Sequence, residues 1–573
     1  PLTPFPRDLR LPPSARGPVF VVPAAALGAA CAPPAPPAPP LDLVVTNARI
    51  IDGTGAPSRT GAVGIANGHI TDVADTGGAA ALAARATRVI DAKGRALSPG
   101  FIDMHSHSDM PLVTDGNAPS KIRQGVTTEV IGESGSIAPQ ASPAEHQPWT
   151  DFAGYFGLLE KQGISVNLIS YVGLGTAREL VIGNDNRPPT ADELKKMQDI
   201  VTASLQQGAA GVSTGLIYPP NAFATVEELI ELSKPAAALG GRYASHLRHD
   251  GKKLRDGIGE AIAIGEGAKV PVHVFHIKVT GQANFGRMKE VIEMVEAAHA
   301  RGVKLTADQY PYVASSTSLT ATLPQWVMDG GADKMVARLK DKATRARVKR
   351  DMQDPNAEWD NRYQSAGTWA NVQLASIGRT RGVATTTEDA NRQYEGMRVE
   401  DAAKKAKKDP FDFVFDLLID TRGSVGCVYF IMSEDDVKLA MKQPWVAVGS
   451  DGSALSIEGP LRSGVPHPRN FGTFPRVLGK YVREEKVISL EEAIRKMTSL
   501  PAATLNLPDR GTIAPGKWAD LVLFDPATVA DTATFENPFQ YPVGIDTVIV
   551  NGKVVLDEGT HTGTRPGQIL RRK

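Results

Sequence analysis

Four histidines occupy positions from which they can serve one metal site. His105 and His107 end an apolar segment two residues apart, so on a strand their side chains point to the same face. His246 and His276 each end another short apolar segment. A single histidine of this kind is more often structural or surface-exposed, but four of the 11 histidines follow the pattern. Because neutral imidazoles are good zinc ligands, the pattern predicts a metal site.

Asp451 adds a carboxylate after another apolar segment, Trp445–Ser450. Such a carboxylate can bind a metal ion and also move a proton from a metal-bound water. An Asp-Gly pair on its own indicates only a turn. Together with the histidines, Asp451 is expected to be both a ligand and the catalytic acid and base. His273 has the opposite strand parity to His276, so it is expected to face helices and is left out of the set.

These residues can meet only if their strands are neighbours. Between residues 99 and 507, eight short apolar strands alternate with helical stretches, which is typical of parallel βα units. This arithmetic predicts an α/β protein with a (β/α)8 TIM barrel, whose active site lies at the carboxyl ends of the strands. The expected strands are Phe101–Ser106, Thr127–Gly132, Asn167–Val172, Gly211–Leu216, Arg242–Leu247, Val272–Lys278, Lys304–Tyr310 and Trp445–Ser450.

Three further regions surround this barrel. Residues 324–434 are helical and charged, and they are too long for a loop, so we expect an inserted lid subdomain over the barrel mouth. Residues 41–98 and 508–573 show β patterning, with Asn-Gly turn pairs at 67–68 and 551–552. We expect them to form one small β-sandwich from both ends of the chain.

Residues 1–40 have the layout of a secretory signal. Basic residues precede an apolar run, Pro18–Ala30, which Cys31 and a Pro/Ala tract follow. We expect export of a bacterial type, periplasmic or secreted; a disordered Ala/Pro tail and a cytoplasmic location stay open. The residues before Cys31 resemble a lipoprotein box with its leucine one place too far away, so a lipid anchor at Cys31 is a further alternative.

Composition limits the partners. Lys plus Arg and Asp plus Glu both number 63, so the formal net charge is zero. Because the sequence also has no block of basic residues, it does not predict binding to nucleic acid or to an anionic membrane. Two cysteines among 573 residues exclude a disulfide framework and a Cys-rich metal module. No segment predicts a membrane span. The expected partner is a small molecule, and the oligomeric state is not indicated.

From about Leu41 onward the chain resembles the metal-dependent amidohydrolase superfamily, on the four histidines, Asp451 and the split β region. Several stretches are similar to the D-aminoacylase (N-acyl-D-amino-acid deacylase) branch: 125–128, 211–218, 307–312, 467–476 and 552–555. The resemblance implies a hydrolase that holds one or two zinc ions (Zn2+) and cleaves the amide bond of N-acyl-D-amino acids, or of dipeptides with a D-residue at the carboxyl end.

The chain departs from this branch after the second strand. The branch usually has Gly-Asn-Cys-Gly there, with a metal-binding cysteine, whereas this chain has Gly-Glu-Ser-Gly at 132–135. A serine hydroxyl is a poor zinc ligand and a carboxylate is a good one. We therefore expect Glu133 to take the role of the cysteine as a metal ligand; whether it bridges two metal ions stays open, and the alternative is a hydrogen-bonded loop residue.

The resemblance also implies the substrate contacts. Lys278 and Tyr310 would bind the substrate carboxylate or carbonyl, and Arg462 would grip the α-carboxylate. Arg469 is the rival for that task, because a guanidinium matches a carboxylate with two hydrogen bonds. Ser315 is a weaker candidate. Each of these side chains could equally be a solvated surface group.

Two other functions stay open. One is an amidohydrolase for cyclic amides or dipeptides, similar to dihydroorotase or isoaspartyl dipeptidase. Such relatives often use a carboxylated lysine as the metal bridge, and the expected third and fourth strands contain no lysine. The other function is of a different class, a secreted binding protein that has lost catalysis, because the expected cysteine is replaced.

Overall fold

The computed structural model of the protein describes residues 39–143, 147–380, 383–384 and 390–572. The expected signal segment and the lipid anchor at Cys31 lie outside these residues, so export stays a prediction from the sequence. In the described part of the chain, no helix is both long enough and apolar enough to cross a bilayer. Residues 40–573 pack as one unit.

Parallel strands among the described residues fill all eight predicted barrel positions. They form two hydrogen-bonded sheets, β6-β7-β8 and β9-β10-β11-β12-β13-β19. The third barrel strand is split at Tyr171 into β8 and β9, and a parallel bridge between Ser106 and Gly452 joins the last strand position to the first. The predicted (β/α)8 fold is confirmed. Its strands are β6 (Phe101–Asp103), β7 (Val126–Ile131), β8 (Asn167–Ser170), β9 (Val172–Gly173), β10 (Val212–Gly215), β11 (Tyr243–His246), β12 (Val272–Val274), β13 (Leu305–Gln309) and β19 (Val446–Val448).

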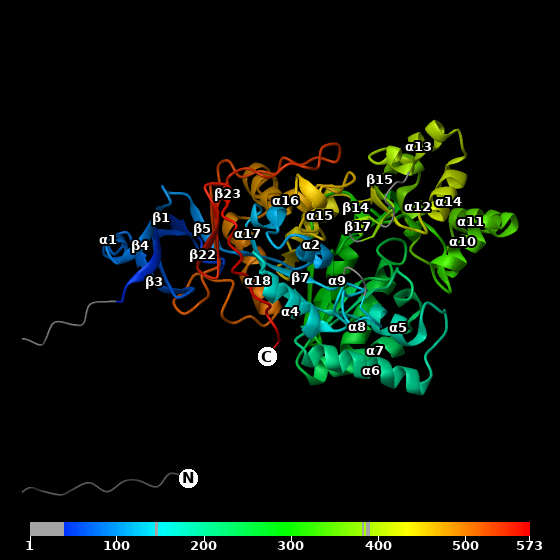
Figure 1. Ribbon diagram of the computed structural model, residues 1–573, viewed down its shortest axis with the longest axis horizontal. Helices are drawn as coiled ribbons and strands as arrows, with labels where there is room; N and C mark the ends of the chain where they lie inside the picture. Colours follow the sequence, from blue (N-terminus) through cyan, green and yellow to red (C-terminus); the bar gives the residue numbers. More distant parts are fainter. Residues whose placement is uncertain (1–38, 144–146, 381–382, 385–389, 573) are drawn as a thin grey trace, which may run out of the picture. The chain divides into compact units, whose positions relative to one another are not determined.

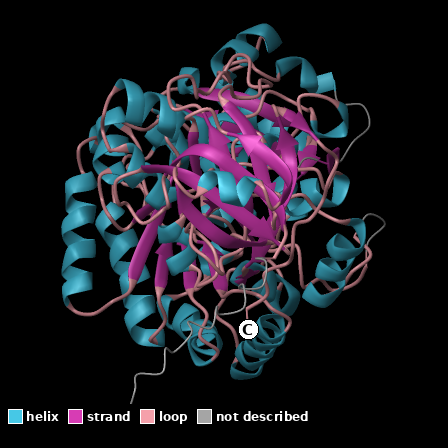
Figure 2. Cartoon of the chain, turned by 90° about the vertical axis from the view of Figure 1, so that its left-hand side faces the viewer, coloured by secondary structure: helices cyan, strands magenta, loops and turns pink. Residues whose placement is uncertain are grey.

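Helices follow the strands and lie around them (Figure 2). Their apolar faces share one buried cluster with the outward strand residues; Val201 and Leu205 of α6, for example, belong to it with Val212 and Val272. Thr190 and Glu193 form a capping box at the start of α6. The helices are α2 (Asp109–Thr114), α3 (Pro119–Ile122), α4 (Phe152–Gln162), α5 (Leu174–Ile182), α6 (Ala191–Gln206), α7 (Val226–Ala238), α8 (Leu254–Ala268), α9 (Met288–Ala300), α15 (Glu434–Met441), α16 (Arg469–Arg476), α17 (Leu490–Met497) and α18 (Ser499–Thr504).

Strands from both ends of the chain share one hydrogen-bonded sheet, in the order β23-β22-β21-β20-β5-β1-β2-β3, with β4 paired to β1. Antiparallel pairing of β20 with β5 joins the two ends. Both predicted Asn-Gly hairpins are confirmed: φ is 52° and 81° at 67–68, and 48° and 76° at 551–552. The elements are β1 (Leu41–Ile50), β2 (Arg59–Ala66), β3 (His69–Asp75), α1 (Ala79–Ala83), β4 (Ala86–Asp91), β5 (Ala96–Pro99), β20 (Leu521–Phe524), β21 (Ile545–Val550), β22 (Lys553–Asp557) and β23 (Thr560–His561).

The chain between β13 and β19 has a hydrophobic core of its own, which runs from Leu319 to Ile431. A three-stranded sheet, β14-β18-β15, lies in this insertion, which is green to yellow in Figure 1. Charged residues of the expected subdomain such as Lys340 and Arg350 are exposed, whereas Arg362 is buried. The elements are β14 (Ser315–Ser318), α10 (Ala332–Lys340), α11 (Lys342–Gln353), α12 (Arg362–Ala366), β15 (Val372–Ile377), β16 (Arg379–Thr380), β17 (Val383–Ala384), α13 (Val399–Ala406), α14 (Pro410–Asp420) and β18 (Val425–Tyr429).

Candidate metal centre

All six side chains expected to bind metal meet at the carboxyl ends of barrel strands. They form two groups that share one member, and within each group the potential ligand atoms lie within 4.8 Å of one another. The first group is His105, His107, Glu133 and Asp451, and the second is Glu133, His246 and His276. Strands β6, β7, β11, β12 and β19 deliver them, so the ring brings together residues that are up to 346 positions apart.

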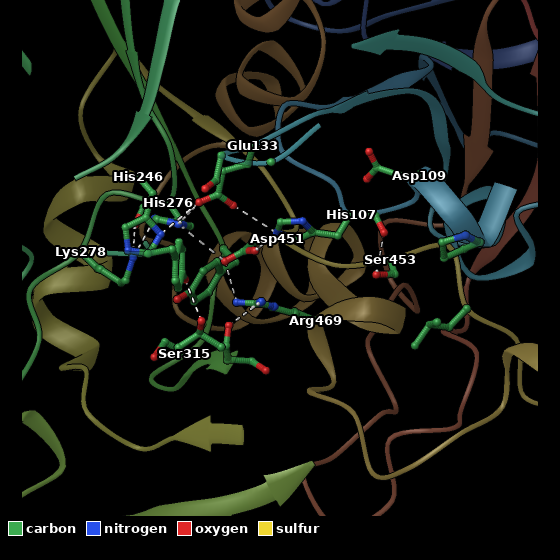
Figure 3. A pocket seen from close by; sticks show the side chains of 18 of the residues that line it. His107, Asp109, Glu133, His246, His276, Lys278, Ser315, Asp451, Ser453 and Arg469 are labelled. Carbon is green, nitrogen blue, oxygen red and sulfur yellow. Dashed lines mark hydrogen bonds and ion pairs between the residues drawn. The ribbon is translucent and has the colours of Figure 1, made fainter. Parts of the chain in front are cut away.

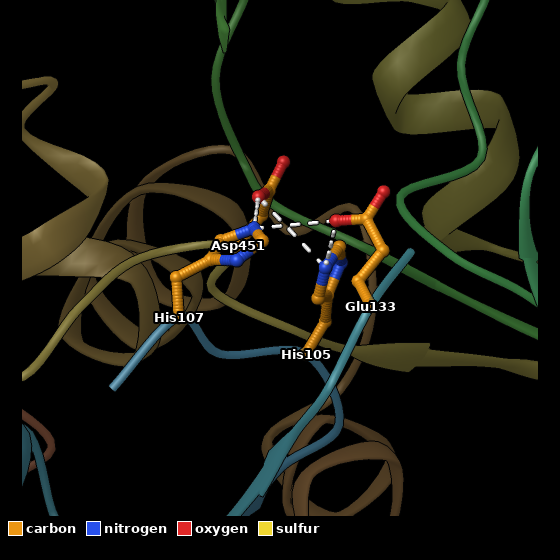
Figure 4. Close-up of side chains that lie close together, drawn as sticks. All are labelled: His105, His107, Glu133 and Asp451. Atoms are coloured by element: carbon orange, nitrogen blue, oxygen red, sulfur yellow. Dashed lines mark hydrogen bonds and ion pairs between the residues drawn. The ribbon is translucent and has the colours of Figure 1, made fainter. Parts of the chain in front are cut away.

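Glu133 turns one carboxylate oxygen toward each group (Figure 4 shows the first). Its Oε2 lies 2.9 Å from His105 Nε2 and 3.3 Å from His107 Nε2. Its Oε1 lies 3.1 Å from His246 Nδ1 and 3.9 Å from His276 Nε2. A carboxylate placed in this way is able to bridge two cations, which the sequence left open.

Asp451 contacts His107 of the first group on one side and the guanidinium of Arg469 on the other. Its Oδ1 is 3.0 Å from His107 Nε2, and its Oδ2 accepts a hydrogen bond of 2.8 Å from Arg469 Nη1. Burial raises the pKa of Asp451, but the opposing effect of Arg469 and His105 is larger. The pKa of Asp451 therefore falls well below its usual range. Asp451 is therefore ionised, which is the state in which a carboxylate binds a cation.

Three residues of the site adopt left-handed backbone conformations: φ is 61° at Ser134, 37° at His276 and 51° at Asp451. Residues other than glycine rarely adopt such angles, at a cost on the order of 1–3 kcal/mol each, and such strain is typical of functional sites. The turns aim side chains that a regular strand would direct elsewhere.

His276 illustrates the consequence, because its strand β12 already ends at Val274. Strand parity therefore does not extend to His276, and the expectation that His273 faces the helices is wrong. Val272 and Val274 face the helices, and His273 lies inside the ring, where it bonds to Thr306 Oγ1 and Asp308 Oδ2 at 2.8 Å each. His273 stays outside the ligand groups because both of its ring nitrogens bond to Thr306 and Asp308.

The donor set fits a divalent cation of the zinc type. Imidazole nitrogens and carboxylate oxygens are the ligands that zinc takes in proteins. Partial loss of hydration lowers the pKa of His107, but the facing carboxylates of Asp451 and Glu133 raise it to about 10. His105 and the neighbouring histidines hold the pKa of Glu133 well below its usual range against the effect of burial. The carboxylates of Asp451 and Glu133 thus favour a positive charge between them, which a bound metal ion would supply.

A pocket of about 480 Å³ opens at this centre (Figure 3). Of the expected substrate contacts, Lys278, Tyr310, Ser315 and Arg469 line it. The guanidinium of Arg469 lies 4.9 Å from the centroid of the Tyr310 ring. Ser315 Oγ is buried without a hydrogen-bond partner among the described residues, which leaves it available to a bound molecule.

Arg462 is not brought to the pocket. It is exposed after a short 3-10 turn, and its guanidinium lies 4.6 Å from the centroid of the Phe539 ring. The structure therefore favours Arg469, the rival candidate, for a substrate carboxylate.

Lys278 lines the pocket but is already engaged. Its Nζ lies 2.7 Å from His276 Nδ1 and 3.1 Å from Asp250 Oδ2. Burial lowers the pKa of Lys278, and Asp250 offsets part of that effect. A lysine that donates to Nδ1 of His276 fixes the ring with Nε2 toward Glu133, so the contacts of Lys278 indicate an orienting role.

Sequence reasoning missed several residues of the pocket wall. Tyr218 follows β10, lines the pocket and bonds to Thr317 Oγ1 at 2.7 Å. Its position after a barrel strand could have identified it. Asp109 and Ser453 line the far end, opposite His246 and Lys278 (Figure 3). Arg362 comes from the insertion, and no pattern in the sequence marks it.

An eight-stranded ring with nitrogen and carboxylate ligands at its carboxyl ends defines the class of metal-dependent barrel hydrolases. Within that class the chain belongs to the amidohydrolase family: the sequence profile described as "Amidohydrolase family" matches residues 88–312 and 370–556. The resemblance noted from the motifs is thereby confirmed.

The relatives place it in the D-aminoacylase branch. The chain is 36% identical to the D-aminoacylase of Alcaligenes xylosoxydans xylosoxydans over 543 residues, which cover 93% of this chain and 98% of the relative. It is 32% identical to the N-acyl-D-glutamate deacylase of Bordetella bronchiseptica, solved with zinc and a phosphonate inhibitor, with a TM-score of 0.77 and coverage of 93% and 100%. A D-aminoacylase with a binuclear metal centre matches at a TM-score of 0.76, 35% identity and the same coverage.

Proposed function

We propose that the protein is a zinc-dependent hydrolase of the amide bond in N-acyl-D-amino acids, or in dipeptides with a D-residue at the carboxyl end. The observation that carries this proposal is the meeting of four imidazoles and two carboxylates around Glu133, in a pocket of about 480 Å³. The relatives add support, since they are D-aminoacylases and an N-acyl-D-glutamate deacylase.

The six ligands would hold one or two zinc ions, with Glu133 shared between them. Bound zinc supplies Lewis acidity, which polarises a carbonyl and lowers the pKa of a coordinated water. The chain itself supplies the enclosure: His105, Glu133, His246 and His276 are all buried, and His107 has 41% of its side chain exposed at the pocket edge.

Asp451 would move the proton. As the water oxygen adds to the carbonyl carbon, a carboxylate oxygen of Asp451 accepts the water proton. When the carbon–nitrogen bond breaks, Asp451 returns that proton to the departing amine nitrogen. The ion pair with Arg469 keeps Asp451 ionised before the reaction starts.

Arg469, Tyr310 and Ser315 would hold the substrate α-carboxylate on one side of the pocket. The other lysine and arginine of the described pocket lining, Lys278 and Arg362, are both paired with buried Asp250. Arg469 already pairs with Asp451 and would be shared between Asp451 and the α-carboxylate. A second substrate carboxylate would meet only Lys278 and Arg362, whose charges Asp250 offsets, so we infer a preference for uncharged side chains.

A zinc-reconstituted screen of acylated amino acids tests the proposal. We expect turnover of N-acetyl-D-methionine, at most weak turnover of its L form, and slower turnover of the D-glutamate and D-aspartate derivatives. A chelator should abolish the activity and zinc should restore it. Asp451→Asn, which keeps the shape of the side chain, should lose at least about a hundredfold in kcat.

The same screen decides between the alternatives. Turnover of cyclic amides in place of acyl-D-amino acids would favour the dihydroorotase-like function. Zinc binding with no hydrolysis of any compound would favour a binding protein. Equal turnover of D and L forms would contradict the stereochemical part of the proposal.

A further inference from the structure

One cation in the pocket wall comes from the insertion. Arg362 begins α12, and only 1% of its side chain is exposed. It lies between residues 313 and 369, the stretch that the family profile leaves unmatched within the barrel. A buried guanidinium is costly unless it is paired, so its partners indicate why it is there.

The partners of Arg362 come from both the insertion and the barrel. Its Nη2 lies 3.2 Å from Asp360 Oδ2 within the insertion, and 2.9 Å from Oδ2 of Asp250, in the loop after β11. Its Nη1 donates to Thr280 Oγ1, in the loop after β12, at 3.3 Å. One side chain therefore fastens the insertion to two barrel loops, and both loops follow strands that deliver metal ligands.

From Asp250 the contacts continue to those ligands. Asp250 Oδ2 is 3.1 Å from Lys278 Nζ, which lies 2.7 Å from His276 Nδ1. The same oxygen is 3.6 Å from His246 Nε2, and Arg362 Nη2 is 3.5 Å from that nitrogen. These are the ring nitrogens that face away from Glu133, where partners set the orientation and basicity of a metal-binding histidine.

The charges within this network balance. Arg362 and Lys278 carry two positive charges, and Asp250 and Asp360 carry two negative ones. Because Arg362 is already neutralised, its contacts suit it to orient the histidines rather than to attract an anionic substrate.

We infer that Arg362 is a positioning residue of the metal centre: through Asp250 and Lys278 it holds His246 and His276, so that this half of the centre is complete only when the insertion is docked. The inference rests on the proposed function insofar as the centre binds zinc. Beyond the proposed function, it states that the orientation of the zinc-binding histidines depends on residues 313–369, which the family profile does not match.

The test measures zinc affinity of the full-length chain by competition with a chromophoric chelator. Arg362→Met removes the guanidinium, and Arg362→Lys keeps the charge without the planar fork. The double variant Arg362→Met/Asp360→Asn removes one charge of each sign and leaves the Lys278–Asp250 pair, which guards against misfolding. Arg345→Met is the matched control, since Arg345 pairs with Asp412 and Asp416 inside the insertion.

We expect the double variant to bind at least one zinc equivalent about 10- to 100-fold more weakly than the wild type, as is usual when a partner of a metal-bound histidine is lost. Arg362→Lys should recover part of the affinity, and Arg345→Met should match the wild type. Wild-type affinity in a folded double variant would overturn the inference alone. A wild-type chain that binds no zinc would overturn the proposed function as well.

Discussion

At the scale of single residues, the chain has a carboxylate at Glu133, where the resemblance to the D-aminoacylase branch implies a cysteine. A thiolate offers one soft sulfur atom, whereas Glu133 offers two hard oxygen atoms, and each oxygen faces a different pair of histidines. The carboxylate is thus able to serve two cations without crowding either one. The separation of the two oxygens gives the chain its capacity for a shared ligand.

Replacing Glu133 should therefore change the metal content. We expect Glu133→Ala to lose one zinc equivalent, or to bind it at least tenfold more weakly, because both groups lose their shared donor. Glu133→Cys should retain more zinc than Glu133→Ala, since a thiolate binds zinc well. Metal analysis after gel filtration measures both variants. Wild-type zinc content in Glu133→Ala would show that the carboxylate only bonds within the loop.

Residue types and strand ends were sufficient to predict that these six candidate ligands meet, because chemistry and position agreed at each of them. Asp250 and Arg362 could not be predicted in this way. Asp250 follows a barrel strand without any distinguishing motif, and Arg362 stands in a charged helical stretch like many others. Their role depends on a contact between segments 112 residues apart, which only folding reveals.

At the scale of elements, all eight barrel strands were predictable from short apolar segments, yet their ends were not. The strand β12 stops at Val274, and a left-handed turn then aims His276 into the site. Parity is reliable only within a regular strand, which explains the wrong placement of His273. The Asn-Gly hairpins were predictable because their turn chemistry is local.

The insertion has a buried hydrophobic cluster of its own, separate from the barrel core. We expect Leu418→Ala, a change in the fully buried face of α14, to destabilise it by about 2–5 kcal/mol. Limited proteolysis should then cut first between residues 319 and 431, while the barrel persists. Arg350→Ala, an exposed change on α11, should leave the cleavage pattern as it is. Unchanged resistance in Leu418→Ala would argue that the insertion does not fold on a core of its own.

At the scale of the whole molecule, the metal centre ties distant parts of the ring together. Its ligands come from the first, second, fifth, sixth and eighth barrel positions, so an ion held there would link loops from most of the circumference. The unfolded chain does not present these ligands together. Binding should therefore stabilise the folded state.

Removing zinc should consequently lower the melting temperature. At a free zinc concentration about 100 times the dissociation constant, binding adds about 2.7 kcal/mol to the free energy of unfolding. The increment should shrink as the pH falls, because protons compete with zinc for His107, whose pKa in the metal-free site is raised, despite partial loss of hydration, to about 10 by the facing carboxylates. Calorimetry with and without a chelator measures it, and His107→Asn should show a smaller response to zinc. A melting temperature that does not change with chelator or with zinc would contradict the prediction that zinc binding stabilises the folded barrel.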